Sequence, residues 1–540
     1  MTHQSILKSS LAFAASLLAL AISNVCGAGV PLDIGSRREL FVDDALVEKL
    51  TGKAELRLHH PVPQEIAIVH DAPWEGNVSH YHSIFKDGDL YRMYHNAMQI
   101  ALTPGKISES HPRFCCYAES DDGIHWRKPE LGLHEFQGSK ANNIVITSGK
   151  AMGLDAVLEP KANSEVGEIN PDAAHPAVFK DENPNAAPDA RYKAIIRSNS
   201  PKGLLAFKSP DGIHWSPMSK VPIITDAPGK TDSGFDSQNL AFWDGARGEY
   251  RAYWRYYTGD VIVGRGGQGF RAIRTATSKD FLHWENLTDL AYGDAPSEQL
   301  YTNQIKPYHR APHILLGFPT RYIDRGWSDS TRALPEREHR ELRAAAAGQR
   351  LGTALSEGLI MASRDGVNFK RWNEAFLRPG IEREGTWAYG NQYIGWQVVE
   401  TKSALEGAPD ELSLYASESY WTDNSSALRR YTLRMDGFVS VNAPMSGGEL
   451  ITKPLRFQGK HLSLNFATSA AGSVRVEIQD ANGKALPGFA LEDCPPLFGD
   501  TIERTVTWKN GSDVSALASK PVHLRFVMKD ADVFAFRFAP

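Results

Sequence analysis

Polar and ionisable residues gather at five places in the chain, each just ahead of a stretch that favours β-structure. They are Glu75, His80 and His82, then His175, then Asp236, Gln238 and Asn239, then Glu298 and Asn303, and finally Trp387 and Gln392. Burying a polar side chain is costly unless it is paired, so such groups beside apolar strands are either hydrogen-bonded or functional. Carboxylates and imidazoles together can divide proton transfers between them, because an imidazole titrates near neutral pH. The set therefore suits acid–base catalysis.

The carboxylates and one histidine of this set are the candidate catalytic residues: Asp236, Glu75, His175 and Glu298. Each carboxylate also has a structural interpretation, as a strand cap, a partner of neighbouring turns, or a solvated charge. The candidate substrate-binding residues are His80, His82, Gln238, Asn239, Asn303, Trp387, Gln392 and Arg255. Arg255 could clamp an anionic group of a ligand, because a guanidinium presents a planar fork of donors.

The elements that must position these residues are indicated by a heptapeptide that recurs. It reads S-D-D-G-I-H-W at 120–126, S-P-D-G-I-H-W at 209–215, S-K-D-F-L-H-W at 278–284 and, degraded, S-R-D-G-V-N-F at 363–369. Apolar β-formers precede each copy, and an Asp-Gly pair favours a tight turn. Each copy therefore predicts a hairpin, and the repetition indicates one supersecondary unit used several times. The repeated histidines are expected to be architectural.

A second strand–turn–strand segment precedes each hairpin, at 83–94, 177–196, 240–257 and 305–321, and a fifth unit fits 393–417. Five units of four antiparallel strands predict a five-bladed β-propeller. The innermost strands of a propeller converge on its axis, so the polar residues ahead of them would meet at one mouth. An alternating run at 54–58 is expected to complete the last blade and close the ring.

The pattern of predicted strands and turns changes after residue 438. Short strands at even spacing, separated by Gly and Asn-Gly turns, predict a β-sandwich over 439–540. This part could bind carbohydrate, although bracing of the propeller is the favoured interpretation. A stretch rich in Glu, Arg and Ala predicts a helical insertion at about 330–352 within a propeller that spans 29–438. The expected fold class is all-β.

The N-terminus is typical of a secretory signal peptide, predicted to span 1–28. Lys8 precedes the apolar run 11–22, and small residues follow near Ala28. No later run approaches about 20 apolar residues, so no membrane span is expected. The net charge of −5 gives no reason to expect a nucleic-acid partner. We therefore expect a secreted or periplasmic protein.

One glycine-rich segment matches the consensus of a dinucleotide-binding motif. Residues 264–269 read G-R-G-G-Q-G, which fits G-x-G-x-x-G. The dinucleotide fingerprint requires a helix next, whereas 270–277 reads as a strand. We interpret the segment as a loop.

Several of these features together resemble the five-bladed propeller glycoside hydrolases, the superfamily that contains families 32, 43 and 130. They are the D-G-x-H-W hairpins, R-E-L-F-V-D-D at 38–44, F-D-S-Q-N at 235–239 and R-M-D-G-F at 434–438. More closely, the chain resembles exported planctomycete-type proteins related to those enzymes. The resemblance covers nearly the whole mature chain.

The resemblance implies three carboxylates, one from each of the first three blades. Asp236 stands at the third position. The chain departs from the pattern at the first position, which falls near Ser79 or His80, and at the second, which is His175. Glu75 and Asp172 lie only a few residues away and could substitute.

The first functional hypothesis is an exported glycoside hydrolase that acts on a poly- or oligosaccharide. Asp236 or Glu75 would protonate the leaving oxygen, and a second carboxylate, or a water activated by histidine, would attack the anomeric carbon. The second hypothesis is a carbohydrate-binding propeller that has lost its acid pair. The third is a sialidase, because the hairpins resemble Asp boxes. No cofactor is required, although His80, His82 and His175 could hold a divalent metal on the axis with Asp236.

Overall fold

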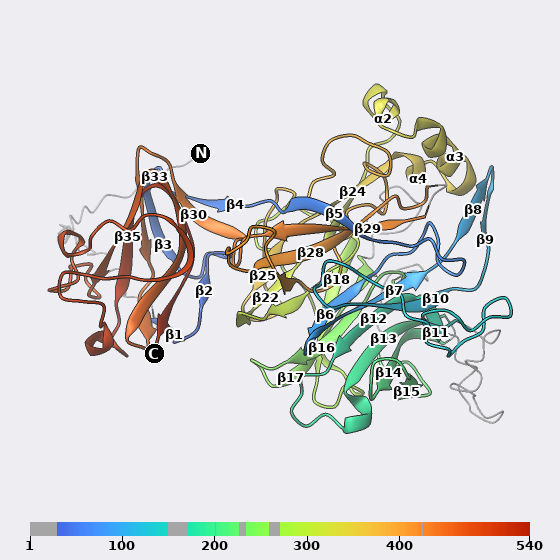
Figure 1. The fold of residues 1–540 in the computed structure, drawn as a ribbon, viewed down its shortest axis with the longest axis horizontal. Coiled ribbons are helices and arrows are strands. Elements are labelled where there is room, and N and C mark those ends of the chain that lie inside the picture. Colours follow the sequence, from blue (N-terminus) through green and yellow to red (C-terminus); the bar gives the residue numbers. More distant parts are fainter. Residues whose placement is uncertain (1–29, 149–170, 200, 226–233, 259–269, 423–424) are drawn as a thin grey trace, which may run out of the picture.

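The computed structural model describes residues 30–148, 171–199, 201–225, 234–258, 270–422 and 425–540. The predicted signal peptide and the glycine-rich segment 264–269 lie outside these residues. The described chain is all-β, as predicted, and Figure 1 shows it in two lobes. Among the described residues, none of the helices has both the length and the apolar character needed to cross a membrane.

The larger lobe contains five four-stranded antiparallel sheets, here called sheets I to V (Figure 1). Sheet I comprises β6 (Ser83–Asp87), β7 (Leu90–Ala97), β10 (Phe114–Ser120) and β11 (Ile144–Thr147). Sheet II comprises β12 (Pro171–Lys180), β13 (Tyr192–Asn199), β14 (Lys202–Ser209) and β15 (Ser216–Pro217). Sheet III comprises β16 (Leu240–Asp244), β17 (Glu249–Tyr257), β18 (Arg271–Ser278) and β19 (Glu285–Asp289).

Sheet IV comprises β21 (Lys306–Tyr308), β22 (Ala311–Gly317), β25 (Met361–Ser363) and β26 (Lys370–Arg371). Sheet V comprises β27 (Val399–Thr401), β28 (Glu411–Glu418), β29 (Ala427–Leu433) and β5 (Val62–Val69). Smaller pieces in this lobe are β20 (Gln299–Leu300), β23 (Thr320–Asp324), β24 (Ala354–Gly358), β8 (Ile100–Thr103) and β9 (Lys106–Glu109). The helical insertion expected at about 330–352 is present as α2 (Asp329–Ala333), α3 (Arg337–Ala347) and α4 (Arg350–Thr353).

Buried hydrogen bonds join the leading ends of the five sheets. The Gln238 side-chain amide, ahead of sheet III, donates to the carbonyl oxygen of Tyr81 ahead of sheet I at 2.8 Å, and to that of Pro176 in sheet II at 2.9 Å. Gln304, ahead of sheet IV, donates to the Gln238 side-chain oxygen at 2.6 Å. Trp396, ahead of sheet V, accepts a backbone hydrogen bond from β6. Residues from the predicted inner strands therefore converge.

The recurring heptapeptides form the tight turns that the sequence predicts. In the first copy, Oδ1 of Asp122 accepts the backbone N–H groups of Ile124 and His125 at 2.7 and 2.8 Å. Oγ of Ser120 accepts the backbone N–H of Gly123, and Nδ1 of His125 lies 2.7 Å from Oδ2 of Asp122. The other copies repeat these contacts, with an asparagine in place of the histidine in the fourth. The histidines are thus architectural.

The prediction that 54–58 closes the last sheet is wrong. The strand that joins sheet V is β5, which pairs with β29. Residues 55–58 form β4 (Glu55–Leu58), which pairs instead with β30 (Val439–Ala443). The alternating polarity of 55–58 indicates a strand but not its partner, which lies more than three hundred residues away.

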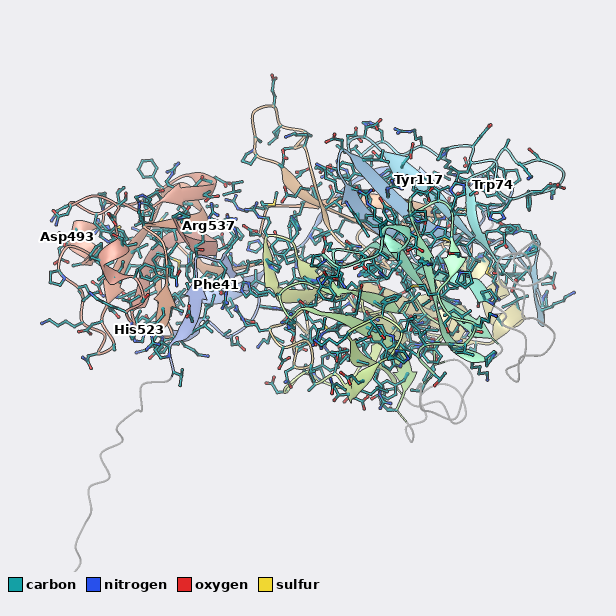
Figure 2. All side chains as sticks on the ribbon, turned by 90° about the horizontal axis from the view of Figure 1, so that it is seen from below. Phe41, Trp74, Tyr117, Asp493, His523 and Arg537 are labelled. Atoms are coloured by element: carbon teal, nitrogen blue, oxygen red, sulfur yellow. The ribbon has the colours of Figure 1, made fainter. Side chains whose placement is uncertain are left out.

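The smaller lobe is built from both ends of the chain. Its remaining strands are β1 (Leu32–Gly35), β2 (Glu39–Leu40), β3 (Val47–Gly52), β31 (Gly448–Thr452), β32 (Leu455–Phe457), β33 (His461–Gln479), β34 (Asp500–Thr505) and β35 (His523–Ala539). Figure 2 shows Phe41 in the same lobe as Asp493, His523 and Arg537, whereas Trp74 and Tyr117 lie in the other. The ring of Phe41 packs 5.9 Å from that of Phe536. Residues 32–58, predicted to belong to the propeller, therefore pair with the C-terminal strands.

Candidate active site

The predicted site residues Asp236 and His175 lie together, and Asp172 completes a row with them. Nε2 of His175 lies 3.2 Å from Oδ1 of Asp236, and its Nδ1 lies 3.2 Å from Oδ2 of Asp172. The side chain of Asp172 is 1% exposed, whereas that of Asp236 is 42% exposed. An imidazole thus lies between a buried and an accessible carboxylate.

Three arginines surround the row. Nη1 of Arg197 lies 2.9 Å from Asp236, and Nη2 of Arg255 lies 3.8 Å from it. Nη1 of Arg113 donates to Oδ2 of Asp172 at 3.0 Å. Burial alone would raise the pKa of both carboxyls, but the hydrogen-bonding and charge of His175 and the neighbouring arginines lower it well below the usual range. Both groups are therefore carboxylates at neutral pH.

Two local features of the backbone place the row. The register of β12 against β13 shifts between Asp172 and Ala177, and this irregularity carries His175. Asp236 lies in the segment that enters β16, where the Asn239 amide donates to the carbonyl oxygens of Phe235 and Ser237 at 2.9 and 2.8 Å. A bulged strand and a braced loop thus bring side chains of sheets II and III together.

Six buried tyrosines pack into one cluster near the row. They are Tyr81, Tyr301, Tyr322, Tyr389, Tyr393 and Tyr420. The ring of Tyr81 lies 5.3 Å from that of His175, and the Arg255 guanidinium lies 4.6 Å from the Tyr301 ring centre. Aromatic faces of this kind stack on apolar ligand faces and on cations. The tyrosine cluster is thus connected to the row through both His175 and Arg255.

Some of the non-glycine residues with positive φ lie in the segments that enter the first strands of the sheets. Tyr81 has φ 56°, Gln304 44°, Trp387 55° and Gln392 56°. Side chains with a Cβ rarely adopt this region, and such strain persists where the surroundings enforce it, often at functional sites. Trp387 and Gln392 are predicted site residues, and Tyr81 and Gln304 are next to predicted ones.

Among the predicted binding residues, His80 and Arg255 accompany the row. Nδ1 of His80 donates to the Val78 carbonyl oxygen at 2.7 Å, which leaves the lone pair on Nε2. Burial lowers the pKa of His80 to about 3, and the charges of His175 and Asp236 also act on it. His80 is therefore a neutral imidazole close to the row.

The side chains of Gln238 and Asn239 hydrogen-bond to the main chain and are not available to contact a ligand. Both are buried, and their amides bond to main-chain oxygens of neighbouring sheets and of the Asp236 loop. Asn303 and Gln392 are also buried. The indole N–H of Trp387 donates to the Gly380 carbonyl oxygen at 2.9 Å, so this ring is tied to its own loop.

Neither Glu298 nor Glu75 forms an ion pair with the Asp172–His175–Asp236 row. Glu298 pairs with Arg321 at 2.8 Å and with Arg371 at 3.0 Å. Glu75 lies in a separate cluster with His70, His82 and His95, where it also pairs with Lys128. The predicted residue His82 belongs to this cluster as well.

Asp172 was predicted only as a possible substitute for the second carboxylate, and Arg197 and Arg113 were not predicted at all. Asp172 stands three residues before His175, and Arg197 lies opposite Asp172 in the β12–β13 register. Arg113 and the tyrosine cluster come from segments scattered along the chain. The register of a hairpin could have pointed to Arg197, whereas no local pattern indicates the others.

The comparisons with known proteins yield distant likenesses only. No protein-family model matches the chain, and no curated protein matches it. A solved glycoside hydrolase aligns with 69% of this chain and 92% of its own, at 11% identity and TM-score 0.40. A family 43 arabinoxylan arabinofuranohydrolase from Bacillus subtilis aligns over 89% and 99%, at 13% identity and TM-score 0.40. The catalytic domain of a GH62 α-L-arabinofuranosidase from Coprinopsis cinerea aligns over 70% and 99%, at 8% identity and TM-score 0.41. Likenesses this weak establish no activity for this chain.

Proposed function

We propose that the protein is a glycoside hydrolase that cleaves a bond in a poly- or oligosaccharide at Asp236. The observation that supports this best is the Asp172–His175–Asp236 row, whose outer carboxylate is accessible. Glycoside hydrolysis needs a proton for the leaving oxygen and a nucleophile for the anomeric carbon. A titratable row beside aromatic faces suits both needs.

The proton for the leaving oxygen comes from the His175–Asp236 pair. The pKa of Asp236 is lowered, so Asp236 is a carboxylate, and the proton that it passes on must reach it from His175, whose Nε2 lies 3.2 Å from its Oδ1. Asp236 passes that proton to the substrate and regains it across the 3.2 Å contact with His175. Asp236 is thus a relay for the proton rather than the stored acid first expected of it.

The attacking water is oriented by His80. This ring is neutral, and its Nε2 lone pair can accept a hydrogen bond from a water molecule. The water adds its hydroxyl to the anomeric carbon, and its proton passes to His80. Glu75, predicted as an alternative acid, has no part here, because its pKa is lowered to about 2 and its contacts lie in the other cluster.

The same proposal includes the setting of the site. Sheets I to V are the blades of a five-bladed β-propeller around the residues that Gln238 and Trp396 connect. The smaller lobe is a β-sandwich that braces it, and the protein is exported by the signal peptide at 1–28. The hydrogen bonds between the leading ends of the five sheets support the ring arrangement.

A carbohydrate-binding propeller without catalysis is the second candidate. The observation in its favour is that both carboxylates of the row are already paired with arginine. Such pairing suits a rigid recognition surface as well as it suits a proton relay.

The deciding experiment measures sugar release from a broad panel of polysaccharides and aryl glycosides, with and without a chelator. We expect the wild type to release sugar and Asp236→Asn to lose at least about a thousandfold in rate. The matched control is Asp189→Asn, which alters an exposed ion pair with Lys208. Release that survives Asp236→Asn would exclude Asp236 as the relay. Binding to one polymer without any release would favour the second candidate.

A further inference from the structure

Three buried histidines converge outside the row. His70 follows β5 of sheet V, His82 precedes β6, and His95 lies on β7. All three are at most 1% exposed, and each offers a ring nitrogen within 4.8 Å of the others. Nε2 of His70 lies 3.0 Å from Nε2 of His82. Three imidazoles from three segments thus enclose one small space, here called the histidine cluster.

The hydrogen bonds around the histidine cluster direct lone pairs inward. Nδ1 of His95 donates to the Asn96 carbonyl oxygen at 2.9 Å, so the lone pair of His95 lies on Nε2. Nδ1 of His70 lies 3.6 Å from Oε1 of Glu75, which favours the proton on that nitrogen and the lone pair on Nε2. Metal-ligating histidines are commonly oriented in this way, with the second ring nitrogen facing a carboxylate or carbonyl.

Two hydrogen-bond acceptors also face each other in the histidine cluster. Nε2 of His95 lies 3.5 Å from Oε1 of Glu75, and neither atom has a hydrogen-bond partner among the described residues. The other oxygen of Glu75 accepts from Lys128 and from the Ala72 backbone. Two buried lone pairs that face each other are costly unless a positive charge lies between them. The arrangement therefore points to a cation.

We propose that the histidine cluster is a binding site for a divalent transition metal of the zinc class. Nε2 of His70, His82 and His95 are the ligands, and Oε1 of Glu75 completes the coordination or orients His70. Imidazole nitrogen favours zinc and its neighbours over calcium or magnesium, which prefer oxygen. Tetrahedral zinc places its nitrogen ligands about 3.3 Å apart, close to the spacing of His70 and His82.

We assign the site a structural role, because the three histidines and Glu75 are each at most 1% exposed. Closed sites contribute to folding, whereas catalytic zinc keeps an open position. A metal here would fix the segment 70–82, which leaves sheet V and enters sheet I, to the second strand of sheet I. It would therefore lock the place where the chain closes sheet V. The axial metal site predicted from His80, His82, His175 and Asp236 is a different set, since of its members only His82 lies in the histidine cluster.

The test is zinc binding by the full chain after removal of metal with a chelator. We expect one equivalent of Zn²⁺ to bind, with a rise in Tm of roughly 5 °C or more. Co²⁺ in its place should give the visible absorption of a tetrahedral nitrogen site. Zinc that binds no better to wild type than to His95→Gln, or that leaves Tm unchanged, would overturn the proposal.

Two variants keep the result interpretable if His95→Gln folds poorly. Glu75→Gln retains the shape of the side chain, and we expect it to weaken zinc affinity about 10- to 100-fold. His309→Gln removes an exposed histidine that pairs with Glu400, and it should bind zinc as wild type does. An equal affinity in wild type and Glu75→Gln would contradict the role of Glu75 beside the metal. Sugar release is measured separately, below the Tm of the metal-free protein, so that failure of either proposal can be recognised.

Discussion

Nε2 of His175 lies 3.2 Å from Oδ1 of Asp236, although the two residues come from different sheets and different turns of the chain. The contact exists because a register shift in β12 carries His175 outward and a braced loop carries Asp236 toward it. On the other side of the ring, Asp172 is buried and paired with Arg113. Proton transfer through Asp236 would therefore depend on groups that do not touch the substrate.

Replacing His175 with glutamine should affect substrates unequally. If His175 stores the proton for the leaving oxygen, sugars with poor leaving groups should lose about 10²- to 10⁴-fold in kcat, because general acid catalysis supplies that range. Aryl glycosides with very acidic phenols need little protonation and should lose far less. Steady-state kinetics on a leaving-group series measures the difference. A uniform loss across the series would contradict an acid role for His175.

Replacing Asp172 with asparagine should lower kcat more than it changes KM. Asp172 is a positioning residue, since it faces Nδ1 of His175 from the buried side and has no access to solvent. Without that carboxylate nothing holds the ring of His175 from its buried side, so steady-state kinetics should show kcat reduced about 100-fold with little change in KM. Arg113→Lys, which retains the charge beside Asp172, is the matched comparison. A lowered Tm with unchanged kcat would indicate a role in folding alone.

The local features of the fold could be predicted, while its long-range pairings could not. The heptapeptide turns depend on the Ser and Asp side chains within each copy, so the sequence contains all the information for them. The partners of residues 32–58 are strands after residue 438, and nothing local distinguishes β4 from β5 as the edge of sheet V. Alternating polarity indicates a strand but not its neighbour.

In the candidate site, too, some contacts could be predicted from local sequence and others depend on long-range strand pairing. Asp236 and His175 come together because they lie near the starts of the first strands of sheets III and II, and Arg255 reaches Asp236 from β17. His95, by contrast, lies one step beyond the pair Ser83 and Tyr94 in the β6–β7 register, which places it beside His82. That hairpin register was available from the sequence. The approach of His70 was not, because it depends on how β5 joins sheet V.

Two substitutions in the first heptapeptide turn should differ in their effect on the free energy of unfolding. Asp122→Ala should destabilise the protein by about 1–2 kcal/mol, because two backbone N–H groups lose their acceptor. His125→Ala in the same turn should cost less than about 0.5 kcal/mol, since that ring is 86% exposed and exposed pairs contribute little. Urea denaturation of both variants measures the contrast. Equal losses would show that the histidine is more than an exposed partner of Asp122.

Acid should weaken the contact between the lobes through Glu39. This side chain is fully buried, with Oε2 2.8 Å from Nη1 of Arg364 and Oε1 3.1 Å from Nε2 of His313, both in the larger lobe. Burial would raise its pKa, but the hydrogen bond with His313 and the charge of Arg364 lower it from 4.5 to about 2. A carboxyl with a lowered pKa stabilises the fold fully above its ordinary pKa. That contribution, on the order of 3 kcal/mol, should be lost as the pH falls from about 4.5 through 2.

Glu39→Gln removes the titrating group and should flatten this acid limb. The variant should be less stable than wild type at neutral pH, because Arg364 loses a buried partner, and the gap should narrow as the pH falls. Asp44→Asn is the matched control, since Asp44 pairs with Lys370 in the same region but its side chain is 61% exposed. Thermal unfolding of the three proteins between neutral pH and the acid limb gives the comparison. A gap between wild type and Glu39→Gln that stays constant with pH would show that Glu39 does not titrate in this range.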